Sequence, residues 1–502
     1  MSKDSVKHIF LYRWRFFFGY SILALMLIGV LTSATLFAPG GLTPAEQNSA
    51  LTSASLSLQN PESLLVVDLP YHALQKASIA VFGVSSFSIK LPSLLLAIAI
   101  GVGFTLLLRR WFTPNVSVIT GSLAVVSAAF IFLAQQGTPA IMTVFWPVFI
   151  LLLASLSFKR AKSKLTAITV PLLGVAAGLS LYTPMNIFLL LSLAAGSILH
   201  PHIRYSARKY IPKHFLALAI LLGVAVALPL AYLIYREPSV ALTLAITSDL
   251  SSFNIVENLK LIALQLFDIT GTSINFTGAI TPFITLPSLL LALLGVFHLV
   301  RNRHGAQNYL LTAWMIMLLP IVVLNPHRPE LLFVPLMLLC GIGIANVLHY
   351  WYSLFPFNPY ARAFGLVPLA VFVGGVVFTD SLRYFQATRY NSALTTNVSQ
   401  DLSTIKGQIT DLQAAEITPI LAVSEDEEAF YQLYNQQERN GELTVTTTVA
   451  EPTSTSAVIA TRESEQVRST QIPTTVLAES HAGEASDRIY LYKTESDIRT
   501  PF

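Results

Sequence analysis

A short segment that follows the first apolar stretch holds a carboxylate in a position suited to acid–base chemistry. Within residues 41–46, Thr43 can cap a helix, Pro44 suits its first turn, and Glu46 stands where the acidic residue of a capping box belongs. That capping box alone would be a sufficient structural role for Glu46. The functional interpretation is a general base at the membrane surface, which hydrogen bonds from helix-start amides would keep ionised.

Further charged residues are placed so that they could join the same site. Asp68 precedes a Pro-Tyr-His segment, where it could cap a helix and act as a second carboxylate beside Glu46. Lys90 lies at the mouth of the second apolar segment, and His327 and Arg328 lie near the start of the tenth. Each cation could simply snorkel to the membrane interface. At that depth, however, they would also hold an anionic lipid headgroup.

The elements that must position these residues are membrane helices. Of the 502 residues, 53% are hydrophobic and only 12% are charged, whereas soluble globular proteins have about 25% charged residues. The apolar residues form blocks of about twenty, the length that crosses a bilayer as a helix. The predicted spans are residues 17–38, 86–108, 115–134, 139–157, 166–182, 185–200, 214–235, 282–300, 307–324, 331–350 and 363–379.

The single cysteine and the N-terminal segment narrow the class of protein further. The only cysteine, Cys340, lies in an apolar block, which excludes a disulfide framework and a Cys-based metal site. The N-terminus has the basic start of a signal peptide, but its apolar run is long for one, so we expect an uncleaved first span.

The distribution of charge predicts the orientation of the chain. Of the 22 Lys and Arg residues before residue 381, 17 fall in segments that are cytoplasmic if the N-terminus is inside. Nine of the ten acidic residues fall in the opposite segments. We therefore expect acid–base chemistry at the outer face, a multi-pass protein of the cell membrane, and an extracytoplasmic C-terminal domain.

Two long outer loops are predicted, at residues 39–85 and 236–281. The first includes an amphipathic stretch from Tyr71 to Phe82 that could lie in the interfacial plane. Its two predicted faces are Leu74, Ser78, Ile79 and Phe82 on one side, and Gln75 and Lys76 on the other. The second loop contains a predicted helix over residues 254–267.

The composition changes at about residue 381. The part before it has 22 basic and 10 acidic residues, whereas the part after it has 9 and 17. We expect a transmembrane domain over residues 1–380 and a small soluble α/β domain over 381–502. Predicted helices cover 399–415 and 426–437, and predicted strands cover 419–423, 443–449, 457–460 and 488–492.

Several segments resemble one family of membrane enzymes. Residues 69–76 (LPYHALQK) and 82–93 (FGVSSFSIKLPS) are similar to the first-loop signature of GT-C membrane glycosyltransferases, in the branch of protein O-mannosyltransferases and the lipid A aminoarabinose transferase. Residues 41–46 are similar to the segment that holds the catalytic Asp or Glu of this family. Residues 328–335 resemble its late Arg-(Tyr)-Leu-Leu motif. The chain departs from the family at Ala45, where an acidic residue is usual, and at residues 134–139, where relatives often have an arginine.

The resemblance implies an all-α polytopic fold of about eleven transmembrane helices and an inverting transfer of a hexose or pentose. The sugar would move from a polyprenyl-phosphate donor to an unknown lipid, glycan or protein acceptor at the outer face. The implied catalytic residues are Glu46 and Asp68. The implied donor-phosphate-binding residues are Lys90, Arg328, His327, Tyr71 and His72. No cofactor besides the lipid-linked donor is expected. A divalent metal is compatible with this chemistry, but no ligand cluster indicates one, and nucleic acid is not an expected partner.

Two other classes of function remain open. A flippase or secondary transporter for lipid-linked glycans would often show repeated halves and intramembrane ionisable residues, and we find no internal repeat and no acidic residue inside a predicted span. A catalytically inactive GT-C-like scaffold would fit the departure at Ala45. An O-antigen ligase or polymerase is a further alternative among the enzymes.

Overall fold

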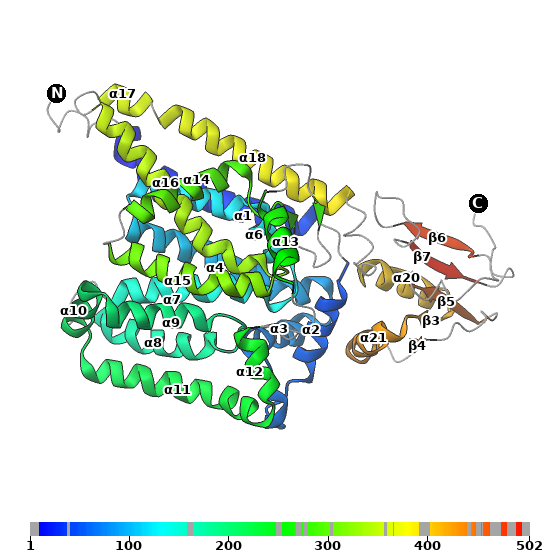
Figure 1. Ribbon diagram of the computed structural model, residues 1–502. Coiled ribbons are helices and arrows are strands. Elements are labelled where there is room, and N and C mark those ends of the chain that lie inside the picture. The colour runs from blue at the N-terminus through cyan, green and yellow to red at the C-terminus, as the bar shows by residue number, and fades with distance from the viewer. Residues whose placement is uncertain are drawn as a thin grey trace.

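The computed structural model describes a bundle of long helices with a small α/β unit at one end (Figure 1). It describes residues 10–37, 41–157, 164–246, 254–267, 273–274, 280–301, 305–355, 359–364, 366–390, 402–438, 443–447, 453, 455–461, 473–478 and 488–493.

Long apolar helices make up the bundle. They are α1 (Phe10–Phe37), α4 (Ser86–Trp111), α7 (Met142–Ser157), α8 (Lys164–Ser180), α9 (Ile187–Leu199), α11 (Lys213–Arg236), α14 (Leu286–Arg301), α15 (Ala306–Leu324), α16 (Phe333–Leu354) and α18 (Leu366–Tyr390). Among the described residues, seven helices are long and apolar enough to cross a membrane, or eight if one bent pair is a single span. The chain is therefore a multi-pass membrane protein.

Each of the eleven predicted spans coincides with an apolar helix or a helix pair. The third is the bent pair, α5 (Pro114–Val126) and α6 (Ala128–Gln135), which meet at 55°. Ser127 lies at the break, and its hydroxyl caps α6 by accepting a hydrogen bond from the Phe130 N–H at 3.3 Å. Helices α8, α9 and α14 are shorter than a full span, so the number of membrane crossings stays a prediction.

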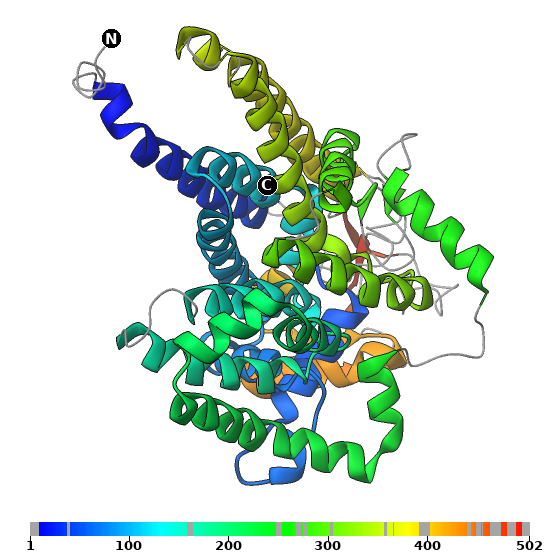
Figure 2. The same ribbon diagram turned by 60° about the vertical axis from the view of Figure 1, so that its left-hand side comes forward.

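Helix pairs in the bundle pack closely where small residues face a neighbouring backbone. Helix α14 lies along α16, and α8 lies along α11. A Cβ atom on Gly295 of α14 would collide with the backbone carbonyl group of Leu339 in α16. Such small residues allow the close approach that stabilises helices in membranes. The N-terminal helix is less enclosed: α1 (blue in Figure 2) projects from the bundle, and its Phe17 and Leu25 are exposed.

Short helices gather at the end of the bundle that faces the α/β unit. They are α2 (Pro44–Ser55), α3 (Leu69–Phe82), α12 (Pro238–Ala245) and α13 (Ile255–Phe267), with the 3-10 helices η2 (Pro61–Leu64), η3 (Pro139–Ile141) and η4 (Pro329–Leu332) and the short strands β1 (Ser273–Ile274) and β2 (Ile280–Thr281). The start of α1 and the helices α10 (Pro201–Tyr210) and α17 (Pro359–Phe364) lie at the opposite end (Figure 1). We call the end of the bundle that faces the α/β unit the α2–α3 end.

A proline in α4 fixes how α3 docks on it. Pro92 has no N–H group, so the carbonyl oxygen of Ser88 lacks its usual donor within the helix. The hydroxyl group of Ser78, in α3, donates a hydrogen bond to that oxygen at 2.6 Å. The proline of the Ile-Lys-Leu-Pro-Ser segment that suggested the family therefore also frees the acceptor, the carbonyl oxygen of Ser88, that holds α3 in place.

The predicted faces of α3 were wrong for one polar residue and for two apolar residues. Gln75 was placed on the polar face but is fully buried, whereas Leu74 and Phe82 are exposed. The helix lies against α2 on one side and α4 on the other, so the residues that meet these neighbours become buried. Gln75 tolerates this position because its amide group is fully hydrogen bonded.

The C-terminal unit is a five-stranded mixed sheet with two helices. Its elements are α20 (Leu402–Ala414), β3 (Thr418–Ala422), α21 (Glu425–Glu438), β4 (Thr444–Thr446), β5 (Ser456–Ala460), β6 (Thr475–Ala478) and β7 (Arg488–Tyr492), in the strand order β4-β3-β5-β7-β6. Strand β3 is parallel to β4 and β5, and β7 is antiparallel to β5 and β6. The sequence missed β6. The predicted domain boundary at residue 380 falls inside α18, and the division into domains stays a prediction.

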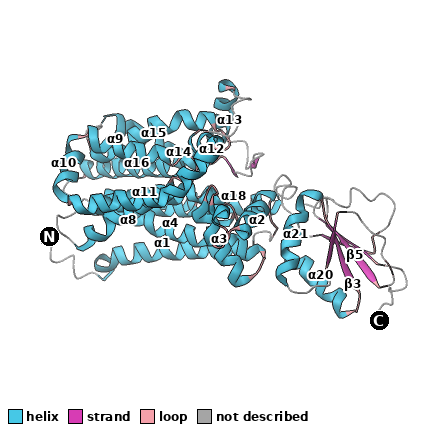
Figure 3. Cartoon of the chain, turned by 90° about the horizontal axis from the view of Figure 1, so that it is seen from below, coloured by secondary structure: helices cyan, strands magenta, loops and turns pink. Residues whose placement is uncertain are grey.

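The helices α20 and α21 lie between the sheet and the bundle (Figure 3). Apolar side chains of the α2–α3 end, such as Leu42 and Ala50, belong to one buried cluster with Ile405 and Phe430 of the C-terminal unit. The amide group of Gln47 also donates a hydrogen bond to Glu427 Oε1 at 3.2 Å. The C-terminal unit is therefore docked directly on the helix that contains Glu46.

Candidate active site

Glu46 begins α2 in the arrangement that the sequence predicts. Its backbone N–H donates to Thr43 Oγ1 at 3.3 Å, and its Oε2 accepts hydrogen bonds from the Thr43 backbone N–H at 2.7 Å and from the Thr43 hydroxyl at 3.2 Å. This is a complete capping box with a proline in the first turn. The predicted structural role of Glu46 is confirmed, and its catalytic role is a separate question.

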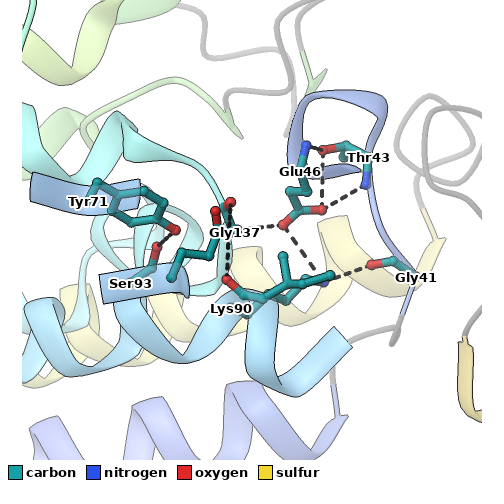
Figure 4. A network of polar contacts seen from close by, with 9 residues as sticks. Gly41, Thr43, Glu46, Tyr71, Lys90, Ser93 and Gly137 are labelled. Atoms are coloured by element: carbon teal, nitrogen blue, oxygen red, sulfur yellow. Dashed lines mark hydrogen bonds and ion pairs between the residues drawn. The ribbon is translucent and has the colours of Figure 1, made fainter. Parts of the chain in front are cut away.

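The other carboxylate oxygen of Glu46 has partners from distant parts of the chain (Figure 4). The backbone N–H of Gly137 donates to Oε1 at 2.6 Å, and Lys90 Nζ lies 4.0 Å from the same oxygen. Lys90 also donates to the carbonyl oxygen of Gly41 at 2.8 Å. A carboxylate has about four acceptor positions, so these three hydrogen bonds leave one position free on Oε1, on a side chain that is 2% exposed.

Gly137 is a residue of the site that the sequence did not reveal. A Cβ atom there would lie 2.7 Å from Ile89 Cγ2 and 3.4 Å from Glu46 Oε1, so only glycine lets this backbone approach the carboxylate. The residue belongs to the segment 134–139, which was noted for lacking an arginine. The glycine before Thr138 and Pro139 could have been noticed as a turn residue in the sequence. That pattern did not indicate that its backbone would contact Glu46.

Gln75 holds the segment of Gly137 against three helices. Its Nε2 donates to the carbonyl oxygens of Ile89 and Gly137 at 3.0 and 2.9 Å. Its Oε1 accepts hydrogen bonds from the hydroxyl groups of Ser49 and Ser53 at 2.8 and 2.6 Å. One buried side chain thus ties α2, α3 and α4 to the loop that donates to Glu46.

Tyr71 and His72, both predicted to bind the donor phosphate, have internal partners. The Tyr71 hydroxyl is 2.8 Å from Ser93 Oγ (Figure 4), and His72 Nδ1 is 2.9 Å from Ser53 Oγ. Burial raises the pKa of Tyr71, and the nearby carboxylates of Glu46 and Asp68 raise it further. Burial lowers the pKa of His72 to about 4. His72 is therefore neutral at pH 7 and brings no positive charge for a phosphate.

Asp68 differs from its prediction. It precedes α3 with left-handed backbone angles (φ 54°), and its side chain makes no capping hydrogen bond. A left-handed N-cap does not aim the side chain at the first amides of the helix, so the predicted cap is absent. No hydrogen bond or ion pair joins Asp68 to Glu46 in the described part of the chain. Burial raises the pKa of Asp68 to about 7, against the lowering effects of Thr183 and Arg328.

The two residues from the late motif lie around Asp68. Arg328 precedes η4 and is partly exposed, and its charge acts on both Asp68 and Glu330. His327 is exposed. The structure thus joins Glu46 to Lys90 directly, places Arg328 within electrostatic range of Asp68, and leaves Tyr71 within range of both carboxylates.

No group of three or more His, Cys, Asp or Glu side chains that could hold a metal ion occurs among the residues with described positions.

Comparison with known proteins gives a family model and a fold. Residues 70–232, which contain Lys90 and Gly137, match the model for dolichyl-phosphate-mannose-protein mannosyltransferase. No curated protein sequence matches the chain. This family match covers one part of the chain, and Glu46 and Arg328 lie outside it.

Solved structures with a similar fold extend over nearly the whole chain. ArnT from Cupriavidus metallidurans bound to undecaprenyl phosphate superposes with a TM-score of 0.53 at 12% identity, covering 94% of this chain and 97% of ArnT. Its apo state gives 0.52 at 11% identity with the same coverage. The oligosaccharyltransferase AglB from Archaeoglobus fulgidus, in complex with an inhibitory peptide and a dolichol-phosphate, gives 0.49 at 11% identity, covering 90% and 70%.

The two ArnT matches, both with a TM-score above 0.5, extend over the apolar helices, the short helices at one end and the C-terminal unit. The chain therefore has the fold of the GT-C membrane glycosyltransferases, and the predicted resemblance to their protein O-mannosyltransferase and lipid A aminoarabinose transferase branch is confirmed.

Proposed function

We propose that this protein transfers a sugar from a polyprenyl-phosphate donor to a hydroxyl group of an acceptor at the outer face of the membrane. Glu46 acts as the general base, and Lys90 and Arg328 stabilise the phosphate that leaves. The fold and the family match support the class of enzyme. The charge distribution supports the placement of the α2–α3 end outside.

One observation carries the proposal: a buried carboxylate, fixed by three hydrogen bonds, lies 4.0 Å from a lysine at the α2–α3 end. The hydrogen bonds fix the orientation of Glu46 and leave one acceptor position on Oε1. An acceptor hydroxyl that donates to this position would be both oriented and activated. Lys90 lies beside the same oxygen, so its ammonium group could reach the phosphate while remaining near the base.

The reaction balances with these groups. The acceptor oxygen attacks the anomeric carbon of the sugar, and its proton passes to Glu46 Oε1. The bond between that carbon and the phosphate oxygen breaks, and its electron pair stays on the phosphate. The charge that develops there is stabilised by Lys90 and Arg328. Because the acceptor approaches opposite the leaving group, the configuration of the sugar inverts.

The test is the Glu46→Gln variant, assayed with polyprenyl-phosphate mannose as donor, following the release of polyprenyl phosphate. We expect a loss of at least about 10²-fold in turnover, because a general base contributes about 10² to 10⁴. Glu62→Gln is the matched control, since Glu62 is exposed and pairs with Arg236 at 2.8 Å. Thermal unfolding of both variants establishes that each remains folded.

Two results would overturn the proposal. Unchanged transfer by a folded Glu46→Gln variant would remove Glu46 from the mechanism. Accumulation of a lipid-linked sugar in proteoliposomes, with no release of lipid phosphate, would identify the protein as a transporter.

A further inference from the structure

Two buried turns meet at the start of α3, close to Tyr71 in the sequence. The backbone N–H of Asp68, at the start of α3, donates to the carbonyl oxygen of Tyr182 at 2.9 Å. Tyr182 belongs to the turn that connects α8 and α9. Asp68 and Met185 both have left-handed backbone angles, φ 54° and 66°. Non-glycine residues rarely adopt this conformation, so both turns are held in an unusual shape by their surroundings.

Three buried polar atoms in these turns have no hydrogen-bond partner. They are Asp68 Oδ1, Thr183 Oγ1 and Asn186 Nδ2, on residues that are 8%, 2% and 3% exposed. The Thr183 hydroxyl is near enough to lower the pKa of Asp68, yet neither atom completes a hydrogen bond. Buried polar groups are nearly always paired. Three unpaired atoms in two joined turns indicate a place that is completed by a bound polar group. We call these three residues the Asp68 cluster.

The donors and acceptors of the Asp68 cluster select the chemistry of that group. Asn186 Nδ2 can only donate, Asp68 Oδ1 can accept, and the Thr183 hydroxyl can do either. A ligand must therefore offer both donors and acceptors. A phosphodiester offers acceptors alone and would leave Asp68 Oδ1 without a donor. A metal ion would be disfavoured by the amide nitrogen. Neighbouring hydroxyl groups, as on a sugar ring, satisfy all three atoms.

We propose that Asp68, Thr183 and Asn186 form a subsite that binds the hydroxyl groups of a sugar ring. The inference rests on the proposed function and deepens it. It assigns Asp68 to holding the sugar, in place of the role of a second catalytic carboxylate. Tyr71 lies within electrostatic range of both Glu46 and Asp68, so both carboxylates lie in the neighbourhood of this side chain. The sugar can come from the donor or from a glycan acceptor.

The test compares two lipids that differ only in the sugar: polyprenyl-phosphate mannose and polyprenyl phosphate. Binding to the purified full-length protein is measured for wild type and for Thr183→Val, which removes the unpaired hydroxyl at similar volume. If the subsite holds the sugar of the donor, we expect the preference for the mannose-bearing lipid to fall at least fivefold, with the affinity for polyprenyl phosphate unchanged. Thr120→Val is the matched control, because Thr120 is also buried with an unpaired hydroxyl but lies in α5. It should bind both lipids as wild type does.

A second arm identifies the source of the sugar. Methyl α-mannoside is titrated into protein saturated with polyprenyl phosphate, and binding is compared between wild type and Thr183→Val. A loss confined to the lipid-linked mannose assigns the subsite to the donor, and a loss confined to the free glycoside assigns it to the acceptor. Thr183→Ser keeps a hydroxyl and should restore either loss.

If Thr183→Val, confirmed as folded, binds both mannose probes as wild type does, the subsite proposal is wrong. That failure is distinct from failure of the proposed function, because these measurements record binding and need no turnover. Conversely, a folded Glu46→Gln variant that still transfers sugar would leave the result for Thr183 intact.

Discussion

Two polar clusters lie within electrostatic range of Tyr71 and differ in how their atoms are satisfied. In the Glu46 cluster (Glu46, Gly137, Gln75 and Lys90), hydrogen bonds from four segments of the chain fix the carboxylate and the amide that supports it. In the Asp68 cluster, three buried atoms have no partner. The comparison suggests that the first is organised before substrate arrives, whereas the second is completed by it. This difference is expected between a group that takes part in the reaction and groups that bind the substrate.

The largest expected effect comes from removing the support of the Glu46 cluster. Gln75→Leu would take this partner from the Ser49 hydroxyl and from the carbonyl oxygens of Ile89 and Gly137. Ser53 Oγ would keep His72 Nδ1 at 2.9 Å. Unpaired buried groups cost about 1–3 kcal/mol each, so we expect a loss of at least about 3 kcal/mol in stability, measured by thermal unfolding. Gln59→Leu, at an exposed position, is the control. Equal stability of the two variants would contradict the idea of a preorganised cluster.

A smaller effect is expected at the glycine of the same cluster. Gly137→Ala places a Cβ atom 2.7 Å from Ile89 Cγ2, and such overpacking costs about 1–3 kcal/mol. Transfer activity should fall as well, because the N–H donor to Glu46 must move. Gly29→Ala, where nothing lies within 4 Å of the added atom, should not lower stability. In a double-mutant cycle, Ile89→Ala should relieve part of the loss; additive effects would mean that the contact with Ile89 is not the cause.

The pH dependence of stability should distinguish the Asp68 cluster. The pKa of Asp68 is raised from 3.8 to about 7, so between these values the folded state binds more protons than the unfolded state. Its contribution to stability is therefore lost as the pH rises towards 7. The pKa of His72 is lowered from 6.5 to about 4, and this acts in the opposite direction below pH 6.5.

The Asp68 contribution is isolated by comparing the wild type with Asp68→Asn between pH 5 and 8, because His72 is common to both proteins. The variant should gain stability relative to wild type as the pH rises, and the difference should level off above about pH 7. Parallel curves would show that Asp68 is not buried as the structure describes.

The smallest expected effect concerns the contact between Gln47 and the C-terminal unit. Glu427→Gln removes the charge from the acceptor of a 3.2 Å hydrogen bond beside Glu46, which should cost about 1 kcal/mol or less. Limited proteolysis of α21 should become faster than in Glu428→Gln, whose side chain pairs within its own helix with Gln432. Equal rates would mean that the apolar cluster alone holds the unit in place.

The sequence predicts features that depend on neighbouring residues and misses those that depend on distant ones. The apolar blocks predict the long helices, and the order Thr43-Pro44-Ala45-Glu46 predicts the capping box. The hydrogen bond from Gly137 to Glu46 joins residues 91 positions apart, and no local pattern contains it. The burial of Gln75 likewise follows from α2 and α4 lying on either side of α3.

The positions of the site residues show the same limit. Lys90 was predicted beside Glu46, and the two are close because the start of α4 meets the loop before α2. Asp68 has left-handed backbone angles that a residue before Leu-Pro does not predict. Thr183 and Asn186 lie more than a hundred residues along the chain and had no motif to mark them.

The hydrogen bond from Ser78 to the carbonyl oxygen freed by Pro92 has a consequence for the depth of the site. Pro92 leaves the Ser88 carbonyl group without its helical donor, and Ser78 pairs with this acceptor in the observed axial position of α3. Sliding α3 by one helical turn along α4 would leave the carbonyl unpaired inside the protein. The proline therefore sets the depth of the site along α4, because it fixes the axial position of α3 and with it the positions of Tyr71 and Gln75.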